Sequence, residues 1–119
     1  MRVVMVSGAF KGAAKWIVEL NVRRAETVAL ELWKLGVAVI CPHTNTRNFD
    51  GAAPEALWAR GYLEILRRCD GLVLIPGWDK SEGARVENAF AGHNRIRVFQ
   101  WPAEAAGFKR WLDEEAFGA

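Results

Sequence analysis

Residues 71–92 of the chain read GLVLIPGWDKSEGARVENAFAG, and this stretch decides the fold. The apolar run from Leu72 to Ile75 stands between a glycine and a Pro-Gly pair, which is typical of a short strand buried on both faces. A polar turn follows, and residues 82–92 are expected to form a helix with Ser81 as its N-cap. A buried strand that leads directly into a helix is the repeating unit of a parallel α/β sheet.

The same strand-like pattern occurs three more times along the chain, at residues 3–6, 37–41 and 96–99. Helical patterns separate these runs. The first has apolar residues at helical spacing, and Pro54 opens the second, whose apolar stripe includes Leu57 and Leu66. The last helix is expected over residues 103–116. This β-α-β-α-β-α-β-α order predicts a three-layer, flavodoxin- or Rossmann-like parallel sheet in the order 2-1-3-4. Four strands are expected, or five if the C-terminal region adds a short one.

Length and composition bound the function. A chain of 119 residues, 51% hydrophobic and 25% charged, predicts one domain over residues 1–119. A net charge of +2 gives no basic field for a nucleic acid polymer. The longest apolar run, at residues 37–41, is far below the roughly 20 residues that a membrane span needs. Cys41 and Cys69 have no metal-ligand spacing, so we expect free thiols in the cytoplasm, with no metal and no cofactor.

Ligands of open α/β sheets bind beyond the carboxyl ends of the strands. That rule selects three loops, at residues 7–15, 42–53 and 76–83, in which the polar and glycine residues of the chain are concentrated. The second loop is expected to be irregular over twelve residues, and a loop of that length in a compact domain is more often functional than idle. The sequence therefore predicts a small-molecule site at this edge of the sheet.

The first loop reads SGAFKG at residues 7–12. Gly8 and Gly12 leave the backbone N–H groups free to face an anion, and Lys11 adds a positive charge. The motif is neither GxGxxG nor a Walker A loop, so a standard dinucleotide site and a P-loop are excluded. A tight strand-to-helix turn explains the two glycines equally well.

The third loop is more specific. Ser81 and Gly83 open a helix, and a helix N-terminus with a hydroxyl and a bare backbone is suited to an anion. Glu87 comes four residues after Gly83, on the same helix face and about one turn (roughly 5.4 Å) deeper. A phosphate at the N-terminus would place an attached sugar over Glu87. The alternative is that Glu87 is a solvated helix residue paired with Arg85 or Asn88.

Other residues of the three loops are weaker candidates. His43 lies at the end of the second strand, where it can contact a base or sugar, although an isolated histidine is more often bonded to backbone. Asn45 can read a base edge, but turns also favour asparagine. Phe10 and Trp78 are suited to stack on a base. The alternative for Trp78 is a lid or a subunit contact.

At this point the sequence resembles a known group. The segment SGAFKG, followed by CDGLVLIPGWDKSEGARVE at residues 69–87, is similar to the nucleoside 2-deoxyribosyltransferase superfamily over roughly residues 3–99. Within it, the closest likeness is to small bacterial and phage domains of unsettled activity. The 2′-deoxynucleoside 5′-phosphate N-hydrolases are more distant.

The resemblance implies roles for particular residues. Glu87 stands where the family has the nucleophile that attacks C1′ of the sugar. Ser81 and Gly83 stand where the nucleotide-hydrolysing branch holds the 5′-phosphate. Contacts to phosphate and base are implied, by position, for the first loop: Gly8, Phe10, Lys11 and Gly12.

One position departs from the family pattern. Counting back eight residues from Asp70 reaches Tyr62, where the family usually has an acidic residue. A second catalytic carboxylate is therefore missing at that place, although Tyr62 can still donate a hydrogen bond. Departure of the base would then need Tyr62, His43 or an asparagine.

The favoured hypothesis is cleavage of the N-glycosidic bond of a nucleoside 5′-monophosphate, by hydrolysis or by transfer to another base. The alternatives are a nucleotide-binding module without catalysis and a protein that handles NAD or a cyclic nucleotide. The resemblance also implies a homodimer. Six tryptophans are many for this length, and we expect Trp33 and Trp58, displaced from the apolar stripes, to lie in its interface.

Overall fold

Four parallel strands form a single sheet in the computed structural model, which describes residues 1–118. The order β2-β1-β3-β4 confirms the predicted topology. The registers pair Met5 with Ile40 on one side and with Leu72 on the other, and Leu72 pairs in turn with Val98. The strands are β1 (Val3–Ser7), β2 (Ala38–Ile40), β3 (Gly71–Leu74) and β4 (Arg97–Gln100).

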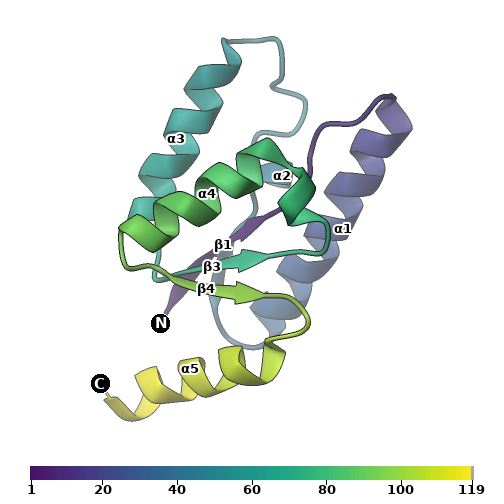
Figure 1. The fold of residues 1–119 in the computed structure, drawn as a ribbon. Coiled ribbons are helices and arrows are strands. Elements are labelled where there is room, and N and C mark those ends of the chain that lie inside the picture. Colours follow the sequence, from purple (N-terminus) through teal and green to yellow (C-terminus); the bar gives the residue numbers. More distant parts are fainter. Residues whose placement is uncertain (119) are drawn as a thin grey trace.

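Helices connect the strands and cover the sheet. They are α1 (Lys15–Lys34), α2 (Pro42–Asn45), α3 (Glu55–Arg67), α4 (Glu82–His93), α5 (Ala105–Gly118) and the short 3-10 helix η1 (Trp78–Lys80). Figure 1 shows the strand arrowheads pointing toward one edge of the sheet, where α2 and the start of α4 lie. The carboxyl ends of the strands therefore meet as the alternating pattern requires.

Two hydrophobic clusters hold the three layers together. On one face, Val4, Val6 and Val73 pack with residues of α1 and α5 that include Leu32, Phe108 and Trp111. On the other face, Met5, Leu72 and Leu74 pack with residues of α3 and α4. Because successive strand residues point to opposite faces, each strand supplies both clusters, which explains its continuous apolar run.

The structure corrects several boundaries. Residues 42–53 were expected to be irregular, but they begin with α2, where Pro42 occupies the first turn of the helix. In α3 the core positions are Tyr62 and Leu66, and Leu57 is 46% exposed, because the helix turns its Tyr62 face to the sheet. The last helix begins at Ala105 rather than 103. The described residues contain no fifth strand.

The chain after β1 passes very close to the chain after β3, at the carboxyl edge of the sheet where a ligand is expected. A Cβ added at Gly8 would lie 2.3 Å from Cγ1 of Ile75, a contact that real Cβ atoms do not make. Glycine at this position therefore lets the chain leave β1 directly beside β3. The first loop can then turn back over the edge of the sheet.

Gly8→Ala is expected to lower the free energy of unfolding by about 1–3 kcal/mol, because buried Ile75 must shift to admit the methyl group. Gly61→Ala is the matched control, since Gly61 is in the interior of α3 and nothing lies within 4 Å of an added Cβ. The free energy of unfolding of Gly61→Ala should rise by up to about 1 kcal/mol, because alanine favours the helix over glycine. Urea unfolding measures both, and equal stabilities of the two variants would contradict the close approach.

Candidate functional site

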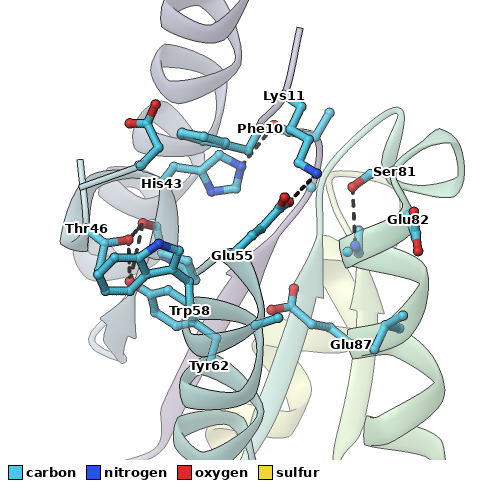
Figure 2. Close-up of a pocket in the computed structure, with 18 of the residues that line it drawn as sticks. Phe10, Lys11, His43, Thr46, Glu55, Trp58, Tyr62, Ser81, Glu82 and Glu87 are labelled. Atoms are coloured by element: carbon cyan, nitrogen blue, oxygen red, sulfur yellow. Dashed lines mark hydrogen bonds and ion pairs between the residues drawn. The ribbon is translucent and has the colours of Figure 1, made fainter. Parts of the chain in front are cut away.

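A cavity of about 730 Å³ opens at the carboxyl edge of the sheet. Its walls come from the loop after β1, from α2 and the loop that follows it, from α3, and from the first turns of α4 (Figure 2). Its size lies within the range of small-molecule sites in proteins. The residues predicted from the sequence that line it are Gly8, Phe10, Lys11, His43, Tyr62, Ser81, Gly83 and Glu87.

Glu87 is the carboxylate set deepest in the site. The hydroxyl of Ser7, the last residue of β1, donates a hydrogen bond of 2.5 Å to Oε1 of Glu87. Burial raises the pKa of the Glu87 carboxyl above its ordinary value, and the hydrogen bond from Ser7 opposes that rise. Glu87 is thus neither solvated nor paired with Arg85 or Asn88; it faces the cavity from one turn inside α4.

The N-terminus of α4 forms one wall of the cavity. Ser81 is its N-cap, as predicted, and its Oγ accepts a hydrogen bond of 3.2 Å from the backbone N–H of Ala84. Gly83 follows in the first turn, and nothing lies within 4 Å of a Cβ added there. Packing therefore does not require glycine, which costs a helix up to about 1 kcal/mol relative to alanine. Its effect is to leave the first N–H groups of the helix bare toward the cavity.

The first loop is held over the cavity from α1. Buried Asn21 donates hydrogen bonds through Nδ2 to the carbonyl oxygens of Phe10, at 3.1 Å, and Lys11, at 3.2 Å. The ammonium of Lys11 forms an exposed ion pair with Glu55, the first residue of α3. The hydrogen bond to Glu55 and the negative charge of Glu55 raise the pKa of Lys11 above its ordinary value, and the charge of Glu82 adds to the rise.

Aromatic rings line the side of the cavity away from α4. Phe10 and His43 meet edge to face with centroids 6.0 Å apart, and Phe49 and Trp58 form a tilted pair at 5.9 Å. Tyr62 completes this wall (Figure 2). A flat, uncharged ring suits this side, because stacked aromatic contacts gain dispersion energy without needing hydrogen-bond partners.

Tyr62 and His43 are held by hydrogen bonds to the neighbouring backbone and side chains. The Tyr62 hydroxyl donates to Oγ1 of Thr46 at 2.9 Å and accepts from Nδ2 of Asn45 at 3.1 Å. Nε2 of His43 donates to the carbonyl oxygen of Ala9 at 3.0 Å. Burial is the main cause that lowers the pKa of His43, so the neutral ring predominates at neutral pH.

Three predicted site residues do not line the cavity. A Cβ at Gly12 would meet Cγ2 of Ile17 at 2.4 Å, so Gly12 serves the packing of the loop onto α1. Asn45 acts on the site only through the Tyr62 hydroxyl. For Trp78 the sequence left open stacking on a base and a lid or subunit contact; in the structure it packs against the hydrophobic cluster of α3 and α4. Its ring is drawn there by apolar burial, and the tryptophan at the cavity is Trp58.

The cavity is also lined by residues that the sequence prediction did not name, among them Thr46, Phe49, Asp50, Glu55 and Trp58. One signal was available for Glu55. It stands seven residues before Tyr62, which is about two helical turns, so both residues share one face of α3. Phe49 and Asp50 come from a loop without any periodic pattern, and nothing in the sequence alone marked them.

Two features are absent from the part of the chain that the structure describes. No group of three or more histidine, cysteine, aspartate or glutamate side chains lies close enough to hold a metal ion. No helix there is long and apolar enough to cross a membrane.

A family model described as a domain of unknown function, DUF4406, matches residues 2–100. The chain belongs to the DUF4406 family. No curated protein matches the chain. The DUF4406 match runs through the end of β4, so every residue that lines the cavity lies inside the family domain.

Stability of the DUF4406 domain should depend on pH through Glu87. Its raised pKa means that the folded state binds the proton more tightly than the unfolded chain does. The stabilising contribution is thus complete at acidic pH and is lost as pH rises through the raised pKa. Glu87→Gln removes this dependence, because glutamine cannot ionise.

We expect the unfolding free energy of Glu87→Gln, relative to wild type, to be higher at about pH 8 than at about pH 5. Urea denaturation at both pH values measures the difference. The opposite sign would show that the folded state favours the ionised carboxylate.

Proposed function

We propose that this DUF4406 domain cleaves the N-glycosidic bond of a nucleoside 5′-monophosphate, with Glu87 as the nucleophile. The arrangement that supports the proposal is the order of chemistry along one cavity. Bare backbone N–H groups of α4 lie at one wall, the Glu87 carboxylate lies one turn inside, and aromatic rings line the opposite wall. A nucleotide has the same order of groups: phosphate, sugar and base.

Each part of such a substrate finds a partner. The N-terminus of α4 carries a partial positive charge and suits the 5′-phosphate, with the Ser81 hydroxyl and Lys11 beside it. The base lies among Phe10, Trp58 and Tyr62, where its flat surface replaces water on the rings. The sugar then spans the middle, with C1′ within reach of Glu87.

The reaction follows the logic of retaining glycosidases. The ionised Glu87 carboxylate stabilises positive charge on the sugar as the base departs, and then bonds to C1′. Water or a second base later takes the sugar from Glu87. The hydrogen bond from Ser7 fixes the orientation of the attacking carboxylate and favours its ionised form.

A second candidate function, nucleotide binding without turnover, is favoured by one observation. Tyr62 stands where the nucleoside 2-deoxyribosyltransferase superfamily, which the sequence resembles, usually has an acidic residue, and its hydroxyl is bonded to Thr46 and Asn45. A residue held in this way is a poor proton donor to a departing base. Release of free base separates the two candidates directly.

Glu87→Gln is expected to abolish base release while leaving nucleotide affinity within about twofold, since the amide keeps the size of the side chain. The measurement is chromatography of free base after incubation with a panel of ribo- and deoxyribonucleoside 5′-monophosphates. Glu64→Gln, which removes an exposed carboxylate of α3 outside the cavity, is the matched control and should retain turnover. Wild-type turnover in Glu87→Gln would remove the nucleophile assignment.

The 5′-phosphate is expected to strengthen binding by more than tenfold, because each charge-assisted hydrogen bond is worth roughly 1.5–3 kcal/mol. Titration calorimetry with a nucleoside and its monophosphate measures the difference. Ser81→Ala should reduce it, although part of that effect comes from loss of the N-cap. Equal affinities for the nucleoside and the monophosphate would contradict the phosphate site.

We also infer a two-fold homodimer from the exposed apolar residues of α1. Leu30 is 55% exposed and Trp33 is 52% exposed, and their spacing places them side by side on the helix. Trp58, expected in the same interface, instead lines the cavity. Light scattering at micromolar concentration should give a molar mass of twice 13.3 kDa for the wild type, and Trp33→Glu should halve that mass. A wild-type monomer would contradict the dimer.

A cytoplasmic location belongs to the same proposal. Cys41 and Cys69 are both free and buried, as expected in a reducing compartment. Burial raises the pKa of both thiols, that of Cys69 to about 11, so neither is a reactive thiolate at neutral pH.

A further inference from the structure

We propose that Glu55 is the proton donor to the departing base and that the substrate's phosphate activates it by taking Lys11 away. This inference rests on the proposed function and supplies the carboxylate that Tyr62 does not provide. The geometry that carries it is a single exposed ion pair, between Lys11 of the first loop and Glu55 of α3, at the cavity.

Glu55 is placed for this role by α3. It shares the face of Tyr62, two turns nearer the start of the helix, and both residues line the cavity. In Figure 2 its carboxylate points into the cavity from the aromatic side, with Glu87 on the α4 side. A base seated among the aromatic rings therefore lies beside Glu55, while its sugar lies over Glu87.

Lys11 lies between two places that can hold its ammonium: the Glu55 carboxylate and a phosphate at the N-terminus of α4. Its ammonium pairs with Glu55, and Figure 2 shows it on the side of Glu55 that faces Ser81. Glu82, the first residue of α4, lines the same cavity as Lys11, and its charge acts on Lys11. A phosphate bound at Ser81 and Gly83 would lie within the same reach.

The exchange of partners is energetically easy. Both side chains of the ion pair are more than two-thirds exposed, at 76% for Lys11 and 71% for Glu55. Exposed pairs of this kind contribute little, because water screens the charges and two long side chains lose freedom. A phosphate held at a helix N-terminus attracts the ammonium more strongly than one solvated carboxylate does.

Departure of Lys11 changes the chemistry of Glu55. While the pair is intact, the ammonium occupies the carboxylate of Glu55. Once Lys11 has moved to the phosphate, the Glu55 carboxyl is free to contact the base and to carry a proton to it. The 5′-phosphate thereby frees the group that the reaction needs as its acid, and a nucleoside without phosphate does not.

The proton and electron changes then balance. As the C1′–N bond breaks, its electron pair leaves with the base, the Glu55 carboxylic acid gives its proton to a ring nitrogen of that base, and Glu87 bonds to C1′. In the second half, water displaces Glu87 from C1′ and its proton passes to the Glu55 carboxylate. Both carboxyl groups end in their starting states.

Glu55→Gln gives two effects of opposite sign, which a merely structural role would not produce. Affinity for a monophosphate should rise by up to about fivefold, because Lys11 no longer has a competing partner. The turnover number for base release should fall by at least about a hundredfold, because the acid is lost. Glu64→Gln removes another exposed carboxylate of α3, which lies outside the cavity and pairs with Arg67 and Arg68, and it should keep wild-type turnover.

A change of leaving group isolates the proton transfer. With a sugar 5-phosphate that carries a 4-nitrophenoxy group in place of the base, departure needs no proton, so the first turnover of Glu55→Gln should release 4-nitrophenolate as fast as wild type does. Glu87→Gln should lose turnover of both substrates. A Glu55→Gln variant that retains wild-type base release, or that slows the first turnover of both substrates alike, overturns the role of Glu55.

The two proposals fail in different ways. If wild-type protein releases no base from any monophosphate, the proposed function falls, and the role of Glu55 as an acid falls with it. The exchange of Lys11 is then judged by calorimetry with the same monophosphates. Unchanged affinity in Glu55→Gln overturns the exchange, and tighter binding retains it as a feature of a binding site.

Discussion

The hydrogen bond between Ser7 and Glu87 joins the two parts of the molecule on which the site depends. Ser7 ends the central strand β1, and Glu87 lies one turn inside α4, eighty positions later in the chain. The bond forms because parallel strands end at one edge and the crossover from β3 brings α4 back over that edge. A shift of β1 against β3 by one residue would turn Ser7 to the opposite face and leave Glu87 buried without a partner.

The surrounding packing protects this register. Gly8 allows the chain to leave β1 in contact with Ile75, and Asp70, just before β3, exchanges two hydrogen bonds with Val3 at the start of β1. Both clusters of the core use alternate residues of the same strands. The buried carboxylate is costly to the fold, and a cost of this kind is characteristic of functional sites.

The fold was predictable because it rests on local patterns. Strand-sized apolar runs, their separation by helical stretches and the right-handed crossover rule predict a parallel sheet with helices on both faces, for which 2-1-3-4 is one of a few possible orders. The relation of Ser81, Gly83 and Glu87 was predictable for the same reason, since helix geometry fixes residues four positions apart. The partner of Glu87 was not, because Ser7 is brought to it only by the sheet.

The wall formed by α2 and α3 shows where sequence patterns fail. The apolar stripe of α3 suggested that Leu57 packs inward, but the helix is rotated so that Tyr62 does. That rotation carries Glu55 and Trp58 into the cavity. It depends on how the whole helix fits the sheet, including the hydrogen bonds of Tyr62 to the α2 segment, and no local spacing encodes it.

Covalent trapping tests the central claim most directly. A nucleoside 5′-monophosphate with fluorine at C2′ slows release of the sugar after the base has left, because fluorine destabilises positive charge at C1′. Mass spectrometry of the intact protein should then show the mass of one sugar phosphate added, and peptide mapping should place it on Glu87. Release of base without any adduct, or an adduct on another residue, would contradict the account.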